Sequence, residues 1–268
     1  MPGRLNTKRS TIRNEVAARG YMYRPELHGP GLPGLLFRSG EKIVATDVVD
    51  ARASSAPFIA GNMRGLYAME TSVPRSIGLS FVAIPLNRTV PNIVLVGRRI
   101  GALALGGFAM HESQRLSLEG DFDRYFRLYC PTDYERDALQ IFTPNLMQLL
   151  IDTTSDCDVE LVDDWMFVYS RWGRTIDGET LDRLEAVTTL VHSTVERQTS
   201  RYRDERSERA GSTISPEEHA ARVGRVAADG ARLKTRASLF QRLVTIGSTV
   251  LLVGALGYVF LNQILPRL

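Results

Sequence analysis

The chain has 268 residues, of which 24% are charged, and a formal net charge of +3. A chain of this length can bury a substantial core. Its two cysteines, Cys130 and Cys157, show neither a pairing motif nor metal-ligand spacing, which argues against a disulfide scaffold and is typical of a reducing compartment.

Charge is distributed unevenly along the chain. The net charge is +5 over residues 1–24 and +6 over residues 222–268, which leaves −8 for residues 25–221. The basic ends therefore account for the pI near 9, and nucleic acid is an unfavoured partner. Three roles stay open for the N-terminal cluster: a solvated tail, contact with lipid headgroups, or a nucleic-acid arm.

The first half of the chain predicts mainly short strands. A basic N-terminal segment, residues 1–24, contains a short helix that ends near Gly20. Because proline cannot donate to a ladder, Pro85 and Pro91 predict that the piece between them is an edge or a connection. Short β-rich runs separated by Gly, Pro or Ser predict strands at 35–38, 42–51, 57–61, 65–71, 78–86, 92–97, 115–119 and 126–130.

Two helices are predicted next. Thr132 and Glu135 form a capping box that starts a helix running through Ile141. Thr143 and Pro144 then predict a second helix, with threonine as its N-cap and proline at its first position.

A hairpin and a long helix complete the predicted domain. Residues 157–172 predict a β-hairpin that turns at Asp163–Asp164, and an amphipathic helix starts near residue 177. Beyond residue 196 the sequence becomes polar all round and predicts a linker, after which Ser215–Pro216 starts a helix leading toward the C-terminus. The apolar face of the long helix consists of Leu181, Leu184, Thr188, Val191 and Val195.

The last residues predict a membrane anchor. The 23 residues from Leu243 to Leu265 carry no charge. As a helix this run reaches about 35 Å, enough to cross a hydrocarbon core of roughly 30 Å. Lys and Arg gather on the cytoplasmic side of a span, so the bulk of the chain is expected in the cytoplasm, at the inner membrane. The basic residues that precede the span, expected to contact anionic headgroups, are Arg232, Lys234, Arg236 and Arg242.

Within the span, Gly247 and Gly254 lie seven residues apart. Small residues at this period let two membrane helices approach closely, which predicts self-association into a homodimer. The alternative is that glycine is simply frequent in membrane helices.

Together these elements predict an α+β fold. An antiparallel sheet domain with packed helices spans residues 25–196, a polar linker and juxtamembrane stalk helix span 197–238, and one transmembrane anchor spans 239–265.

Residues 115–151 contain paired phenylalanines, an aspartate, an alanine-bearing helix and a proline. This pattern resembles a widespread bacterial family of membrane-associated proteins of unknown function, which shares F-x-x-x-F-x-V followed by Asp, Ala and L-x-P. The resemblance covers roughly two thirds of the chain, and it implies an α+β fold but no activity. The family often places its membrane segments elsewhere. The matching positions are Phe122, Phe126, Leu128, Asp133, Ala138 and Pro144.

Candidates for chemistry are few. The densest acidic cluster lacks the ligand alternation of a calcium loop, the histidines stand alone, and no phosphate-binding glycine loop occurs. The sequence therefore predicts no cofactor and no metal, and it leaves the catalytic residues unknown. Two functions stay open: a binding, scaffold or regulatory domain with an unknown protein partner, or a membrane-tethered enzyme that uses an acidic cleft. The acidic cluster comprises Asp152, Asp156, Asp158, Asp163 and Asp164.

Overall fold

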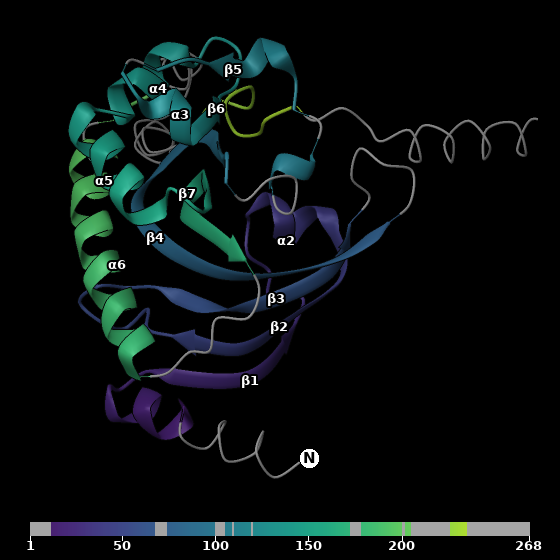
Figure 1. Cartoon of the computed structure of the whole chain (residues 1–268), viewed down its shortest axis with the longest axis vertical. Coiled ribbons are helices and arrows are strands. Elements are labelled where there is room, and N and C mark those ends of the chain that lie inside the picture. Colours follow the sequence, from purple (N-terminus) through teal and green to yellow (C-terminus); the bar gives the residue numbers. More distant parts are fainter. Residues whose placement is uncertain are drawn as a thin grey trace, which may run out of the picture.

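The computed structural model describes residues 12–67, 74–99, 105–108, 110–118, 120–171, 178–199, 202–204 and 226–234. Within these ranges the protein has an α+β fold, in which a strongly curved sheet carries helices on both faces (Figure 1). None of the described helices is long and apolar enough to cross a bilayer. The predicted anchor, 239–265, lies outside the described residues.

Seven strands form one sheet in the order β1-β2-β3-β4-β6-β5, and β7 pairs with β4 outside this order. Every pairing is antiparallel, as predicted. The strands are β1 (Met22–His28), β2 (Gly40–Asp50), β3 (Ile59–Tyr67), β4 (Arg75–Gly97), β5 (Arg115–Leu116), β6 (Phe126–Tyr129) and β7 (Asp158–Arg171).

Strand β4 organises the sheet because it pairs with three others. It pairs with β3 over 75–83 and with β6 over 94–97, while β7 pairs with it over 79–95. Because β7 occupies one side of β4, β3 and β6 must share the other side, where they leave a gap between them. Pro85 and Pro91 lie in this gap, where a strand can lack a donor without losing a ladder bond.

The strand predictions are confirmed in part. Residues 42–51 and 126–130 correspond to β2 and β6. The predicted strands 57–61 and 65–71 both overlap the single strand β3, with 68–71 outside the described residues, and 78–86 and 92–97 fall on the single strand β4. The predicted hairpin at 157–172 is wrong, because β7 continues through this stretch. Asp163 adopts a φ of 54° where the β4–β7 register shifts. Aspartate tolerates this left-handed conformation, so the local turn signal produces a bulge instead of a turn.

The prediction of a strand at 35–38 is also wrong. These residues form helix α2 (Leu35–Ser39). The Leu35 N–H, which has no partner within a helix, donates to the buried carboxylate of Glu160 at 2.8 Å. A contact 125 residues away in sequence therefore helps decide the local structure.

The larger helices follow their predictions more closely. Helix α5 (Pro144–Thr154) has Thr143 as N-cap and proline at its start, as expected. Helix α4 (Glu135–Ile141) has Tyr134 as N-cap, so the predicted capping box at Thr132 is wrong. Short helical turns occur at α3 (Phe122–Tyr125), η2 (Leu105–Gly107) and η3 (Glu112–Gln114), and residues 12–18 are helical.

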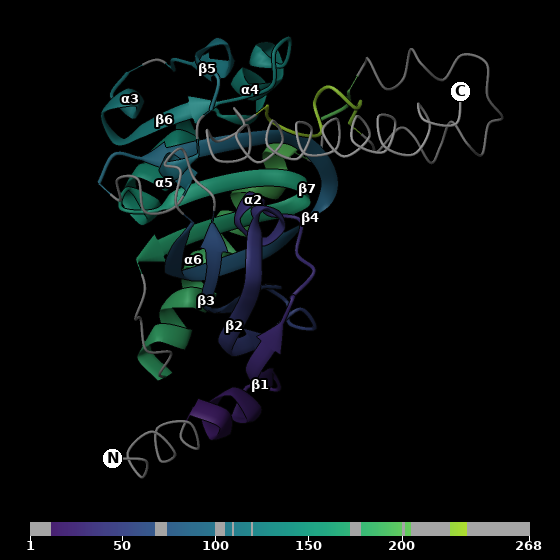
Figure 2. The same ribbon diagram turned by 90° about the vertical axis from the view of Figure 1, so that its right-hand side faces the viewer.

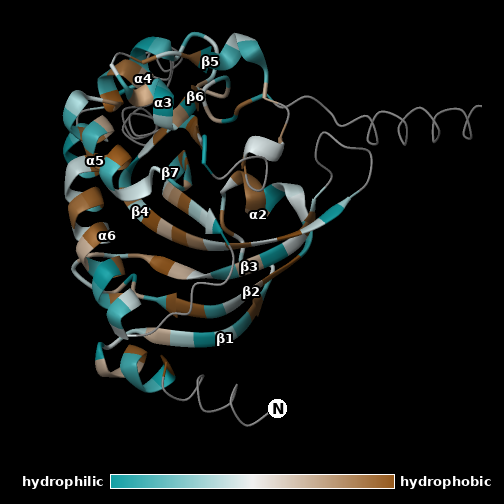
Figure 3. Ribbon diagram, viewed as in Figure 1, coloured by the Kyte–Doolittle hydropathy of each residue, from teal (hydrophilic) through white to brown (hydrophobic). Residues whose placement is uncertain are grey.

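Helix α6 (Gly178–Thr199) confirms the predicted long amphipathic helix. Of its predicted apolar face, Leu181, Thr188, Val191 and Val195 are buried. Hydrophobic and hydrophilic residues alternate along α6, as expected for a helix with one buried face (Figure 3).

The sheet separates two apolar cores. One core joins the strands to residues 12–16 and to α3, α4, α5 and α6. The other joins the opposite face to α2 and to Leu105 in η2. Figure 2 shows α2 in front of the sheet and α6 behind it. Helices thus cover both faces of the sheet.

Candidate functional site

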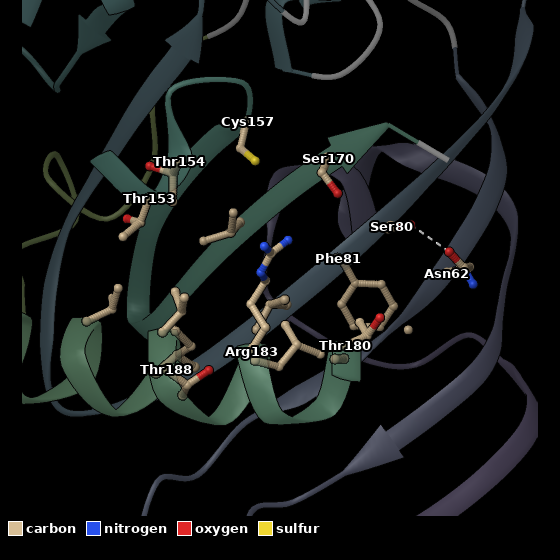
Figure 4. Close-up of a pocket in the computed structure, with 18 residues that line it drawn as sticks. Asn62, Ser80, Phe81, Thr153, Thr154, Cys157, Ser170, Thr180, Arg183 and Thr188 are labelled. Carbon is tan, nitrogen blue, oxygen red and sulfur yellow. Dashed lines mark hydrogen bonds between the residues drawn. The ribbon is translucent and has the colours of Figure 1, made fainter. Parts of the chain in front are cut away.

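An apolar hollow of about 140 Å³ lies between the sheet and α6 (Figure 4). Its floor consists of two rows of cross-strand neighbours, one residue each from β3, β4 and β7. The first row is Asn62, Ser80 and Ser170, and the second is Ala60, Val82 and Val168. Cross-strand partners share one face of a sheet, so both rows face α6.

The roof of the hollow is one side of α6, and its end wall is the junction of α5 and β7. The α6 residues of the lining lie one helical turn apart, at Thr180, Leu184, Val187 and Val191 among others. Cys157 contributes to the end wall and is 6% exposed. The hollow is therefore assembled from five elements, β3, β4, α5, β7 and α6.

Polar groups gather at the end of the hollow where α6 begins. Ser80 and Asn62 lie there, and the Ser80 hydroxyl donates to Asn62 Oδ1 at 2.6 Å. Thr180 is on the first turn of α6. Farther along β4 and α6, toward the other end of the hollow, Ile84 and Val191 are buried apolar residues. Thr153, Thr154 and Thr188 also lie toward that end (Figure 4), where the hydroxyls of Thr153 and Thr154 donate to the Leu149 and Leu150 carbonyls of their own helix.

Arg183 extends from α6 across the hollow toward β7 (Figure 4). Among the described residues that line the hollow, it alone carries a charge. The neighbouring acids on α6 are engaged elsewhere, since Asp182 and Glu185 each pair with Arg19 at 2.7 Å. Within the described ranges no carboxylate forms an ion pair with Arg183, so its guanidinium is available to a ligand.

The sequence singled out Leu184, Thr188 and Val191 as part of an apolar helix face, but not the polar residues Asn62, Ser80, Ser170 and Arg183 of the same hollow. The available signal was weak: polar side chains at alternate positions of otherwise apolar strands, and one arginine beside the apolar face of a helix. Only the strand register brings them together.

Two acidic residues are buried in β7: Asp158, which belongs to the predicted acidic cluster, and Glu160, which does not. Asp158 accepts hydrogen bonds from the N–H groups of Gly97 and Leu105, both at 2.7 Å. Glu160 accepts from Leu35 N–H at 2.8 Å and from the Tyr169 hydroxyl at 3.2 Å. Burial raises the pKa of each carboxyl to about 7, against the opposing effect of these donors.

These carboxyl groups tie loops and α2 to the sheet. Both have 0% exposure, so the raised pKa accompanies a structural role and not an open cleft. Within the described ranges no three His, Cys, Asp or Glu side chains gather as a metal site. Cys130 lies in the core, where burial raises the pKa of its thiol to about 12, far from the value of a nucleophile.

The C-terminal strap, residues 226–234, lies at the gap beside β4. Asn92 N–H donates to the Gly230 carbonyl at 2.9 Å, and Leu233 N–H donates to Asn92 Oδ1 at 2.9 Å. Asn92 Nδ2 in turn donates to the Leu161 carbonyl at 3.0 Å. One buried asparagine therefore connects the strap to both β4 and β7.

Further contacts hold both ends of the strap. Ala227 N–H donates to Asp204 Oδ2 at 2.8 Å, and the Tyr134 hydroxyl donates to the same oxygen at 2.7 Å. At the other end, Lys234 N–H donates to Gln114 Oε1 and Gln114 Nε2 donates to the Lys234 carbonyl, both at 2.8 Å.

The strap changes the interpretation of two predicted membrane-flanking residues. Arg232 forms a bidentate pair with Asp163 at 2.5 and 2.7 Å, so its guanidinium contacts the domain. The backbone of Lys234 is fixed to Gln114. Residues 226–234 are turns, bends and irregular chain, so the prediction of a juxtamembrane helix is wrong here. Arg236, Arg242, Gly247 and Gly254 lie outside the described residues.

The residues that carry the family resemblance occupy structural positions. The rings of Phe122 and Phe126 lie 5.1 Å apart in the core, and Leu128 and Ala138 are both 0% exposed. Asp133 has a φ of 71° in the turn before α4, and Pro144 starts α5. The pattern therefore describes packing around α3, β6, α4 and α5.

The chain matches no protein-family model and no curated protein. Among solved structures, it is similar to the crystal structure of the mycobacterial trehalose monomycolate transport factor A, TtfA. The TM-score is 0.47 and the sequence identity 8%, over 71% of this chain and 93% of that chain. A likeness at this level does not establish a common fold, and the resemblance to the bacterial membrane-associated family stays a prediction.

Proposed function

We propose that this chain is a single-pass membrane protein, anchored by residues 239–265, whose cytoplasmic α+β domain acts by binding. The anchor is supported by the 23 uncharged residues from Leu243 to Leu265, a length that suits a membrane helix. The cytoplasmic orientation is supported by the basic residues before this run.

The strap supports a close placement of the domain at the bilayer. Its last described residue, Lys234, is fixed to Gln114, and eight residues separate it from Leu243. Eight residues span at most about 28 Å even when fully extended. The domain would therefore stay near the inner leaflet, where lipid headgroups and other membrane components are its accessible partners.

The observation that carries the binding role is the composition of the hollow. Apolar side chains and hydroxyl groups line most of it, together with Asn62, Cys157 and Arg183, and the described lining includes no histidine, aspartate or glutamate. Acid–base catalysis needs such groups within hydrogen-bond reach of a substrate. The alternative, a tethered enzyme with an acidic cleft, finds no such cleft among the described residues, since Asp158 and Glu160 are enclosed by protein donors.

Labelling of single added cysteines tests the topology. Cys130 and Cys157 are 0% and 6% exposed, so the full chain should give little background with a membrane-impermeant maleimide. Glu41→Cys, at an exposed position of β2, should be labelled in inverted membrane vesicles and protected in intact cells. Leu268→Cys should show the reverse pattern. Labelling of Glu41→Cys in intact cells would refute the cytoplasmic placement.

A further inference from the structure

We propose that the hollow beneath α6 binds a single-chain aliphatic carboxylate, with the chain in the apolar end and the carboxylate beside Arg183. This proposal rests on the proposed binding function and names its ligand class. It does not depend on the membrane anchor.

The size of the hollow sets the length of the enclosed chain. An apolar cavity of roughly 150 Å³ holds a benzene-sized group, or about six carbons, and this hollow has about 140 Å³. At its apolar end Ile84, Val187 and Val191 present a surface that gains from contact with methylene groups. Threonines also line this end, and the hydroxyls of Thr153 and Thr154 are occupied by carbonyls of their own helix. The hollow therefore accepts about six carbons of an unbranched chain.

The polar end selects the headgroup. Arg183 offers a planar guanidinium, which matches a carboxylate in a bidentate arrangement. Ser170 lies at the same end and offers a hydroxyl donor, and the start of α6 adds the positive end of its dipole. One cation surrounded by neutral groups suits a monoanion better than a multiply charged phosphate, whose second charge would have no partner.

Asn62 adds a further donor to this end. It is 8% exposed, and its Oδ1 accepts the Ser80 hydroxyl. Asn62 also lines the hollow, and no hydrogen bond of its Nδ2 to another described residue occupies this donor. A carboxylate oxygen would supply the acceptor.

The native cysteines supply a site-resolved assay. Cys157 lines the hollow, whereas Cys130 lies in the core away from it. The full chain in phosphatidylcholine nanodiscs is alkylated with N-ethylmaleimide, and modification of each cysteine is followed by mass spectrometry. A ligand in the hollow should slow modification of Cys157. Cys130 is the internal control, because it can react only when the whole domain unfolds.

The titration uses a series of straight-chain carboxylates from butanoate to dodecanoate, with the matching alcohols. Affinity should rise about fourfold per methylene group and level off at about six tail carbons, when the hollow is full. Partition of the ligand into the nanodisc bilayer would instead keep rising with chain length. An apparent affinity that rises through dodecanoate without a plateau would therefore overturn the proposal.

Matched variants separate the headgroup from the chain. Arg183→Gln should weaken carboxylates about fivefold, the value of a partly exposed ion pair, and leave the alcohols unchanged. Arg136→Gln, at an exposed position of α4, should change neither. Val187→Phe should fill the hollow and abolish protection by every ligand, while unchanged Cys130 modification shows that the variant is folded.

The outcomes are distinguishable. If alcohols protect Cys157 as well as carboxylates do, the ligand class is refuted and the binding function stands. If no ligand of either series protects Cys157, both the ligand class and the assignment of this hollow as the binding site are refuted.

Discussion

Replacement of Gly230 by alanine tests whether the strap is seated as described. A Cβ at this position would overlap the ring of Tyr134. The ring cannot move aside easily, because it is 0% exposed and its hydroxyl is bonded to Asp204 at 2.7 Å. Gly230→Ala should therefore either strain the core or lift the strap away from Asn92.

The magnitude follows from overpacking. An extra methyl group in a well-packed core costs about 1–3 kcal/mol, so we expect a loss of about 2 kcal/mol in the free energy of unfolding. For a domain of this size that corresponds to a decrease in Tm of about 4–8 °C. Thermal unfolding of the full chain in detergent, followed by near-ultraviolet circular dichroism, measures it.

Gly178→Ala is the matched control. Its Cβ would lie 3.4–3.5 Å from the Glu15 carboxylate, an ordinary contact, and alanine suits the start of α6. This variant should keep the wild-type Tm within about 1 °C or raise it. Tyr134→Leu should partly relieve the effect of Gly230→Ala, so the two changes should not be additive. A wild-type Tm for Gly230→Ala would refute the packing of the strap on Tyr134.

Three further predictions concern stability. Burial raises the pKa of Glu160 and Asp158 to about 7 in the fold, above their unfolded values, so the folded state binds more protons and stability should fall as pH rises from 5 to 8. Glu160→Gln should flatten this dependence in urea titrations, and an unchanged slope would contradict it. The Tyr67 hydroxyl is buried without a partner among the described residues, so Tyr67→Phe should leave stability equal or raise it by up to about 1 kcal/mol; a loss above that amount would indicate a missed hydrogen bond. Asp163→Asn should cost about 1 kcal/mol or less, because its pair with Arg232 is about one third exposed, and the cost should shrink in 0.5 M salt.

Local signals predicted the parts of the fold that local interactions determine. Helix α5 begins at Pro144 because threonine and proline suit the first helical positions wherever they occur. Helix α6 follows its 3.6-residue apolar pattern, since Leu181, Val191 and Val195 all reach the core. The prediction of an antiparallel sheet followed from short β-rich runs separated by Gly, Pro or Ser.

Long-range contacts decided the remainder. Asp163 carries a strong turn signal, but β7 continues past it because β4 provides a partner on both sides of the bulge. Leu35 starts a helix whose first N–H finds its acceptor in Glu160, 125 residues away in sequence. The roof of the hollow follows from the predicted apolar face of α6, but its floor could not be predicted, because Asn62, Ser80 and Ser170 become neighbours only through the pairing of three strands.

Membrane extraction tests the central claim most directly. Membranes that contain the full chain are washed with alkaline carbonate and compared with membranes from cells that express residues 1–234, which keep the strap contacts to Gln114. The full chain should remain in the pellet until detergent is added, whereas residues 1–234 should appear in the supernatant with the same Tm. Release of the full chain by carbonate alone would contradict an anchor at residues 239–265.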